Sequence, residues 1–280
     1  MSDAAEPPSQ TFSVTLSQLL ATQSFGKPFH FFSTIDSTNT YAVRLARGGA
    51  SEGTVVIADE QRGGKGRLGR SWVSPPGVNL YLSLILRPAV STILIPQINL
   101  LAAVAVADTI IEVCGLSPSI KWPNDVLIDE KKVCGILAEM QTEAGIVQSV
   151  VLGIGVNINA SLSAFPPELL DKASSLFLVG GKTVDRAVFT ASLLTHLEKL
   201  YILWLEERFP ALRSAWERHA AGLLGKQIIV AAPEGTIAGT VLGLDDDGAL
   251  LLRDQDRGAV RRILAGDVTV VGGYVRGETS

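Results

Sequence analysis

Cysteine and net charge are both scarce in this chain of 280 residues. Its two cysteines, Cys114 and Cys134, lack the spacing of a metal site, and so few thiols cannot form a disulfide framework. The formal charge is −4, whereas a protein that reads a nucleic-acid backbone normally carries a net basic face. The sequence therefore favours a reducing compartment, with the cytoplasm as the default, and argues against nucleic-acid binding.

Long uninterrupted apolar runs are also missing. Polar residues interrupt the most apolar stretch, residues 93–116, at Gln97, Asn99, Asp108 and Glu112. A membrane span needs about 20 mostly apolar residues, so we expect a buried helix and no membrane association. Pro96 and Gly115 stand where such a helix would begin and end. The N-terminus lacks a basic start followed by an apolar run, so no secretory signal is predicted.

Strand-like and helix-like segments alternate from residue 30 onward. Runs rich in β-branched and aromatic residues predict strands at 30–35, 54–58, 79–86, 133–140 and 148–154. Apolar periodicity predicts helices at 38–47, 96–114 and 187–219, the last broken at Pro210. This mixture predicts an α+β or α/β domain.

The pattern changes after Gly222 to short apolar runs separated by Asp- and Gly-rich turn signals. The runs lie at 227–231, 236–244, 249–252, 260–264 and 268–271. Five short strands predict a small β-barrel. We therefore expect an N-terminal extension over residues 1–28, a catalytic domain over 29–221, a β-barrel domain over 222–273 and a tail over 274–280.

The strongest local signal is a basic, glycine-rich loop, QRGGKGRLGRSW, at residues 61–72. Gly64 and Gly66 would let a ligand approach the backbone, while Lys65, Arg67 and Arg70 would neutralise phosphate oxygens. A solvated, flexible loop could have the same composition. The spacing is not that of a P-loop, and a lone GxGxxG match without a ribose-binding acid is not a dinucleotide fingerprint.

Polar side chains follow the first predicted strand. Asp36 or Ser37 could cap the next helix. The hydroxyl and amide side chains of Ser37, Thr38 and Asn39 could equally hydrogen-bond a polar, uncharged ligand. Gln61 offers the same chemistry at the end of the next strand.

Further along, the segment KWPND places Lys121, Asn124 and Asp125 in a bend fixed by proline. A plain turn would need neither the lysine nor the tryptophan. Lys132 precedes a strand whose Gly135 would let a ligand approach the backbone, although a surface lysine at a hairpin would look the same. The later segment GIGVN, with Gly153, Gly155 and Asn157, is either a bulge or a base-binding turn.

The order of these motifs resembles that of biotin protein ligases. From about residue 30 the chain presents STN, Q..GKGRLGR.W, KWPND, K..GILAE and GIGVNIN, and the predicted barrel follows. The resemblance implies a mixed β-sheet with flanking helices, like that of class II synthetases, and a small C-terminal β-barrel. It also implies an enzyme that makes biotinyl-5′-adenylate from biotin and ATP with Mg²⁺. Biotin would then pass to one lysine of a biotin carboxyl carrier protein domain, in acetyl-CoA carboxylase or a related carboxylase.

The resemblance also assigns roles to residues. The implied biotin contacts are Ser37, Thr38, Asn39, Gln61, Gly64, Lys65, Lys132, Gly135, Gly153 and Gly155. The implied ATP contacts are Lys65, Gly66, Arg67, Arg70, Trp72, Lys121, Asn124 and Asn157. The implied catalytic residues are Lys132, Lys65, Arg67 and Asp125. Lys132 would bridge the biotin carboxylate and the α-phosphate, and Asp125 would be a Mg²⁺ ligand or the partner of the acceptor lysine.

Two positions depart from the family pattern. Lys65 stands where arginine is frequent, and Leu68 where another cation can occur, so we expect a weaker hold on the adenylate. Fewer than 30 residues precede the predicted catalytic strands, so the DNA-binding domain of some members is not expected. The oligomeric state, monomer or homodimer, stays open.

Two alternatives share the fold. One is a lipoate ligase or octanoyl transferase, and the other is a biotin-binding regulator without catalysis. Octanoyl transferases use a reactive cysteine, whereas Cys134 lies in an apolar strand with no evident histidine partner. The intact basic loop disfavours the regulator.

Overall fold

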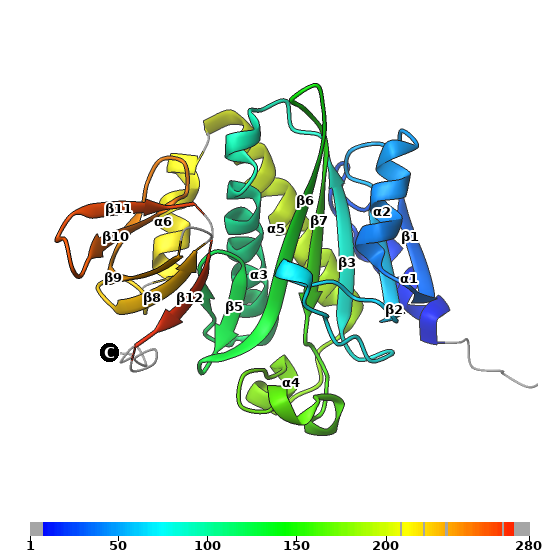
Figure 1. Cartoon of the computed structure of the whole chain (residues 1–280). Coiled ribbons are helices and arrows are strands. Elements are labelled where there is room, and N and C mark those ends of the chain that lie inside the picture. The colour runs from blue at the N-terminus through cyan, green and yellow to red at the C-terminus, as the bar shows by residue number, and fades with distance from the viewer. Residues whose placement is uncertain (1–7, 208, 221, 233–234, 265, 272–280) are drawn as a thin grey trace, which may run out of the picture.

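The computed structural model describes residues 8–271, except for 208, 221, 233–234 and 265. The tail expected at 274–280 and the first seven residues of the expected extension lie outside the described residues. A large sheet and a smaller one lie side by side, with helices around the larger (Figure 1).

The larger sheet has seven strands in the order β1-β2-β3-β7-β6-β5-β4. Their bounds are β1 (Phe29–Ile35), β2 (Val55–Gln61), β3 (Leu80–Leu86), β4 (Ser119–Lys121), β5 (Asp125–Ile128), β6 (Lys131–Glu143) and β7 (Ile146–Val156). Only β1 and β2 run parallel, and the other neighbours pair antiparallel. The expected mixed sheet is confirmed.

Helices cover both faces of this sheet. Their bounds are α1 (Pro8–Leu19), α2 (Thr38–Arg47), α3 (Gln97–Cys114), α4 (Leu176–Gly180), α5 (Arg186–Glu207) and α6 (Phe209–His219). Successive strand residues point to opposite faces, so Val56 packs with α2 while Val55 and Ile57 join the core with α3 and α5. The main core therefore lies on the α3 and α5 face.

Helix α3 is long and apolar enough to cross a membrane by length and composition alone. Twelve of its 18 residues are nevertheless buried inside the protein, and it packs against α5, α6 and β6. Pro96 caps its start, and Gly115 follows its end in the left-handed conformation, with φ of 65°. The buried core helix expected from the sequence is confirmed.

The expected break in the segment 187–219 is present, because it forms two helices, α5 and α6. The break comes just before the expected position, so Pro210 is the second residue of α6, where its missing N–H costs nothing. The bend KWPND is a turn between β4 and β5, two short strands that were not expected. Its Trp122-Pro123 peptide bond is cis.

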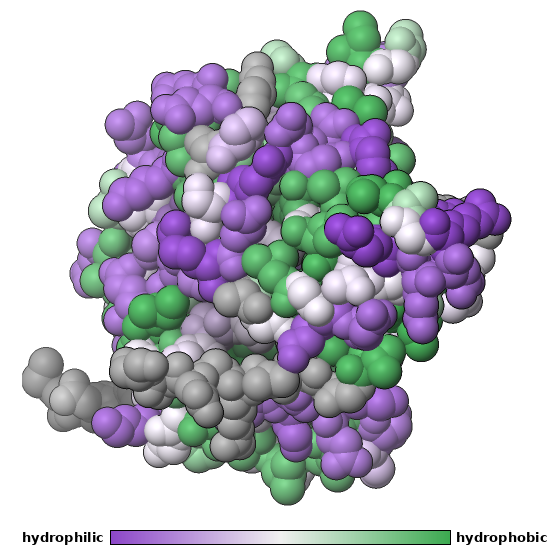
Figure 2. All heavy atoms as spheres, turned by 90° about the vertical axis from the view of Figure 1, so that its left-hand side faces the viewer, coloured by the Kyte–Doolittle hydropathy of each residue, from purple (hydrophilic) through white to green (hydrophobic). Residues whose placement is uncertain are grey.

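The C-terminal strands form an antiparallel sheet in the order β11-β10-β9-β8-β12. Their bounds are β8 (Gln227–Ala232), β9 (Gly235–Leu244), β10 (Leu250–Asp254), β11 (Val260–Ile263) and β12 (Asp267–Val270). All five expected strands are present. Figure 2 shows this side of the molecule, where hydrophilic side chains predominate and apolar ones gather in smaller patches.

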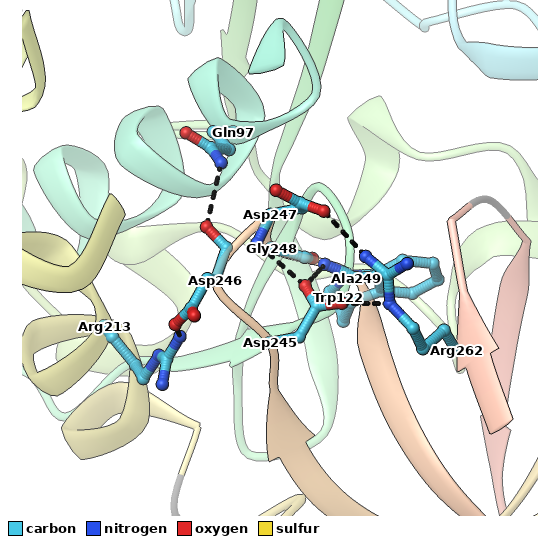
Figure 3. Close-up of polar contacts among 9 residues, drawn as sticks. All are labelled: Gln97, Trp122, Arg213, Asp245, Asp246, Asp247, Gly248, Ala249 and Arg262. Atoms are coloured by element: carbon cyan, nitrogen blue, oxygen red, sulfur yellow. Dashed lines mark hydrogen bonds and ion pairs between the residues drawn. The ribbon is translucent and has the colours of Figure 1, made fainter. Parts of the chain in front are cut away.

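The turn between β9 and β10 docks the smaller sheet onto the larger domain (Figure 3). Trp122 donates its indole N–H to the Gly248 carbonyl at 3.3 Å, and Gln97 donates to the Asp246 carbonyl at 3.3 Å. The Asp246 carboxylate forms an ion pair with Arg213 of α6. The turn thus joins the C-terminal sheet to α3, to α6 and to the KWPND segment.

Candidate functional site

The basic loop folds into a compact hairpin. Gly66 donates to the Arg70 carbonyl at 2.7 Å, and Trp72 donates to the Gly64 carbonyl at 2.9 Å. Leu68 occupies the exposed tip with φ of 55°, a conformation that costs energy for a leucine. These internal hydrogen bonds give the loop a defined hairpin shape.

Arg67 ties this loop to both domains. Its guanidinium donates to Asn124 Oδ1 at 2.8 Å and to the Gly266 carbonyl at 3.3 Å. Asp267 of β12 lies 3.6 Å from Arg67 and forms an ion pair with Arg70. The loop is consequently fastened between the KWPND turn and the C-terminal sheet.

A narrow pocket of about 50 Å³ lies beneath the loop. Nine of the ten expected biotin contacts line it: Ser37, Thr38, Asn39, Gln61, Lys65, Lys132, Gly135, Gly153 and Gly155. Gly64 does not line it, because its backbone packs against the loop: a Cβ there would lie 2.5 Å from the Trp72 carbonyl oxygen. The sequence thus identified the pocket walls, and Gly64 instead shapes the loop above them.

One wall of the pocket is a continuous polar network. Gln61 Oε1 accepts from the Thr38 backbone N–H at 2.8 Å and from its hydroxyl at 3.0 Å. Ser83 Oγ lies 2.8 Å from Thr38 Oγ1 and 2.5 Å from Asn39 Oδ1. Asn39 donates to Glu139 at 2.7 Å. Such fixed donors and acceptors suit a ligand with a polar, uncharged ring.

Ser37 caps a helix, whereas its neighbours Thr38 and Asn39 form the polar network. Its hydroxyl accepts from the Thr40 backbone N–H, so it is the N-cap of α2, as one of the two interpretations held. It also lines the narrow pocket. The cap fixes the first turn of α2, which carries Thr38 and Asn39 to the pocket.

Three glycines of the sheet leave space for two side chains. A Cβ on Gly135 or Gly155 would lie 2.7 or 2.5 Å from the indole of Trp72, and these glycines are paired across β6 and β7. A Cβ on Gly153 would lie 2.2 Å from Asn39 Oδ1. The indole therefore lies flat against the sheet, and its Nε1 has no hydrogen-bond partner among the described residues.

A larger cavity of about 440 Å³ adjoins the narrow pocket. Seven of the eight expected ATP contacts line it: Gly66, Arg67, Arg70, Trp72, Lys121, Asn124 and Asn157. Lys65 lines only the narrow pocket. The cavity also has apolar walls, at Phe165 and Leu169 among others, so it offers both charge and apolar surface.

Some expected ATP contacts already have partners. The Asn157 side chain donates to the Ser174 carbonyl at 3.0 Å, and it is 4% exposed. Asn124 accepts from Arg67 and donates to the Ile136 carbonyl at 2.8 Å. Both amides therefore hold the cavity walls in place as well as lining it.

Five residues line both spaces: Gly66, Arg67, Trp72, Asn124 and Lys132. Two of them, Arg67 and Lys132, are cations. The Lys132 ammonium lies 2.7 Å from Asp125 Oδ1 and 5.3 Å from the centre of the Trp72 ring. Positive charge is thus concentrated where a ligand in one space would meet a ligand in the other.

The carboxylates of the site do not form a metal centre of their own. Among the residues that the structure describes, no group of three or more His, Cys, Asp or Glu side chains could hold a metal ion. Mg²⁺ is commonly bound by one or two carboxylates together with substrate phosphates. Asp125, with its side chain 20% exposed at the larger cavity, fits such a shared site.

Comparison with known proteins places this geometry in a family. Residues 31–157 match the biotin/lipoate A/B protein ligase family, and residues 223–271 match the biotin protein ligase C-terminal domain. The bifunctional ligase/repressor BirA of Bacillus subtilis is 41% identical over 249 residues, which are 89% of this chain and 76% of that protein. The biotin--[acetyl-CoA-carboxylase] ligase of Paracoccus denitrificans is 38% identical, over 78% of this chain and 91% of that protein.

The chain belongs to the biotin protein ligase family. A solved structure supports the same assignment. The biotin protein ligase of Aquifex aeolicus, in complex with biotin and ATP, has a TM-score of 0.75 and 30% identity to this chain. The alignment covers 88% of this chain and 99% of that one.

The octanoyl transferase alternative requires a reactive cysteine, and Cys134 does not fit that role. It is fully buried in β6, and burial raises the pKa of its thiol, although Lys132 nearby lowers it in part. Cys114 is half-buried, and burial raises its thiol pKa as well. Both thiols therefore stay protonated at neutral pH.

Sequence reasoning missed several residues of this candidate site. Ser83 and Glu139 complete the polar network, and Tyr81 lines the narrow pocket with its hydroxyl donating to the Pro75 carbonyl at 2.9 Å. Burial raises the pKa of Tyr81, so the hydroxyl remains a donor. The sequence did offer a signal for Ser83, because it is the one small polar residue in the run LYLSLIL, whose other members are leucine, isoleucine and tyrosine.

Proposed function

We propose that this chain activates biotin with ATP to form biotinyl-5′-adenylate and then transfers biotin to a lysine of a carrier domain. The observation that carries this proposal is the junction of the two spaces at Arg67 and Lys132. A polar pocket and a larger, charged cavity meet there, as joining a small carboxylic acid to a nucleotide requires.

In the first step, the bicyclic head of biotin would lie in the narrow pocket. The ureido ring would exchange hydrogen bonds with Thr38, Gln61 and the network behind them, and the carboxylate would reach Lys132. The remaining biotin contacts expected from the sequence, Asn39, Gly135, Gly153 and Gly155, would shape the pocket around the ring. The Trp72 indole now fills the space above Gly135 and Gly155, which we call the glycine slot. Trp72 would then pack over the ligand once its indole leaves this slot.

ATP would occupy the larger cavity with its phosphates toward Arg67 and Arg70. Lys121 would add charge, and Asn124 and Asn157 would hold the walls near the base. The carboxylate and the triphosphate repel each other, so cations between them bring the carboxylate oxygen within reach of the α-phosphorus. Lys132 and Arg67 are the two cations that line both spaces. Lys65 and Gly66 would support the loop that carries them.

We assign Mg²⁺ to the phosphates of ATP, with Asp125 as the protein carboxylate that would help to hold it. Bound there, the ion would neutralise phosphate charge. In the second step the acceptor amine, with an unperturbed pKa of about 10.4, must lose a proton. Asp125 is the carboxylate placed beside Lys132 and would help to accept that proton.

The acceptor we propose is a biotin carboxyl carrier protein domain of a carboxylase. The Paracoccus relative is named as a ligase for acetyl-CoA carboxylase, which supports this class of partner. The two free cysteines support a cytoplasmic location. We propose that the reaction uses no nucleic acid and no membrane.

A biotin substrate is favoured over lipoate by the pocket chemistry. The polar network of Thr38, Gln61 and Ser83 suits a ureido group, which both donates and accepts. The dithiolane ring of lipoate offers no comparable partners, and a pocket built for hydrogen bonds rejects ligands that lack them.

The test compares substrates directly. The protein is incubated with ATP, Mg²⁺ and either biotin or lipoate, and pyrophosphate release and labelling of a carrier domain are measured. We expect release and labelling with biotin alone. Labelling with lipoate and not with biotin would contradict the proposal, and biotin binding without pyrophosphate release would favour a non-catalytic regulator.

A further inference from the structure

Asp267 is the first residue of β12 and reaches across to the basic loop. Its carboxylate forms an ion pair with Arg70 and lies 3.6 Å from Arg67. The neighbouring Gly266 carbonyl accepts from Arg67 at 3.3 Å. The Asp267 side chain is 31% exposed and lines the larger cavity. A negative charge thus stands inside a cavity proposed for a polyanion.

A carboxylate and a phosphate present similar acceptor oxygens to a guanidinium. Arg67 and Arg70 are the arginines proposed to meet the triphosphate, so Asp267 uses the donors that phosphate oxygens would use. Arg67 also has an uncharged partner in Asn124 at 2.8 Å. That bond can persist when the carboxylate leaves, so the exchange need not release Arg67 entirely.

We propose that Asp267 is a stand-in for nucleotide phosphate. It fastens the loop to the C-terminal sheet in the nucleotide-free protein and so sets the apparent affinity for ATP. The inference rests on the proposed function, because it takes ATP as the competing ligand. Binding must first displace the carboxylate, so the apparent affinity equals the intrinsic affinity multiplied by the fraction of molecules in which the loop is unfastened. Asp267 acts through Arg67 and Arg70, so it is a positioning residue.

Asp267→Asn tests the idea, since it removes the charge and keeps the shape. We expect the KM for ATP to fall about three- to tenfold at saturating biotin, with kcat for pyrophosphate release retained. Asp267→Glu restores the charge and should bring the KM back toward that of the parent protein. Asp246→Asn is the matched control, because Asp246 also pairs with an arginine across the two domains, Arg213 of α6 (Figure 3).

Limited trypsin digestion gives a readout that needs no turnover. Arg67 and Arg70 are themselves cleavage sites, and the fastened loop should resist the protease. In the absence of ATP, we expect Asp267→Asn to be cut in the loop several-fold faster than the parent protein, and Asp246→Asn to be cut at the parent rate. MgATP should slow cleavage of Asp267→Asn.

Two results would overturn the proposal: a KM for ATP that is unchanged or raised in Asp267→Asn, or equal loop cleavage in Asp267→Asn and the parent protein. Failure of the proposed function looks different. The parent protein would then release no pyrophosphate from ATP and biotin, while the nucleotide-free digestion would still decide whether Asp267 holds the loop.

Discussion

At the residue scale, Lys132 lines both the narrow pocket and the larger cavity and lies 2.7 Å from Asp125. Its neighbour Lys131 uses its ammonium differently, donating to the Leu170 carbonyl at 2.9 Å. Two adjacent lysines, indistinguishable as a surface pair in the sequence, thus have separate tasks. Of these two lysines, only Lys132 lines both of the spaces proposed for the ligands.

We expect Lys132→Ala to lower the rate of adenylate formation about 100-fold or more, because the carboxylate and the triphosphate, which repel each other, lose the cation between them. Pyrophosphate release with biotin and ATP measures this. Circular dichroism should show an unchanged fold, since Lys132 is partly exposed. Lys131→Ala is the control and should keep most of the activity. Equal losses in both variants would remove Lys132 from its role.

The glycine slot beneath Trp72 makes a second prediction at this scale. In Gly155→Ala the new methyl group would lie 2.5 Å from the indole, so the ring must move into the space proposed for biotin. We expect the KM for biotin to rise about tenfold. Gly180→Ala is the control, because its Cβ would meet only ordinary contacts at 3.5 Å. An unaltered KM in Gly155→Ala would mean that the indole and biotin do not share this slot.

At the scale of elements, Glu198 of α5 fastens the segment before β1. Its carboxylate accepts from the backbone N–H groups of Gln23, Ser24 and Phe25 at 2.7–2.9 Å. Burial alone would raise the pKa of Glu198, but these backbone donors outweigh it, so the pKa is lowered. A single anionic side chain therefore accepts from three consecutive backbone N–H groups of this segment.

A lowered native pKa gives a defined pH dependence. The stabilisation is fully present above the ordinary carboxyl pKa and is lost as the pH falls through the lowered native value. We expect Glu198→Gln to reduce the free energy of unfolding by about 2 kcal/mol at pH 7, and by less as the pH falls. Urea unfolding at several pH values measures it, with the exposed Glu206→Gln on the same helix as control. A pH-independent difference would contradict the assignment.

Long elements were predictable from the sequence, and short ones were not. Helix α3 has both of its end signals, Pro96 and Gly115, and a long apolar pattern between them. Strands β4 and β5 have three and four residues, which is too few for an alternation to be recognised. The polar motifs were found because each stands near a strand end, and the sheet order then gathers those ends.

The site residues that sequence reasoning did not identify were overlooked for a different reason. Ser83 lies in the middle of an apolar strand, and Glu139 in the middle of β6, so neither stands at a boundary that marks function. Asp267 contacts the loop only through the docking of two domains, which local patterns do not reveal. Lys65 was expected at both biotin and ATP, and it lines the narrow pocket but not the larger cavity.

At the scale of the whole molecule, Trp122 connects the domains. Its buried indole donates to the Gly248 carbonyl of the smaller sheet, and the same turn carries Asn124 and Asp125 to the site. The C-terminal sheet therefore supports the site indirectly, through the hydrogen bond of Trp122, and contacts the basic loop directly through Asp267.

Trp122→Phe removes the indole N–H and leaves an aromatic ring. We expect the free energy of unfolding to fall by about 1–3 kcal/mol, because the Gly248 carbonyl loses its donor and a small cavity remains. Trp216→Phe controls for the cavity, since Trp216 is equally buried and its Nε1 has no partner among the described residues. Urea unfolding compares the two variants. Equal destabilisation would mean that the cross-domain hydrogen bond contributes nothing.

The bond between Arg67 and the Gly266 carbonyl joins residues 199 positions apart in the chain. During synthesis at about 5–20 residues per second, the loop leaves the ribosome roughly 10–40 seconds before its C-terminal partner is made. A nascent chain thus carries the basic loop without the strand that fastens it. Attachment of β12 would be among the last tertiary contacts to form, and it would mark the moment at which a newly made molecule acquires its mature affinity for nucleotide.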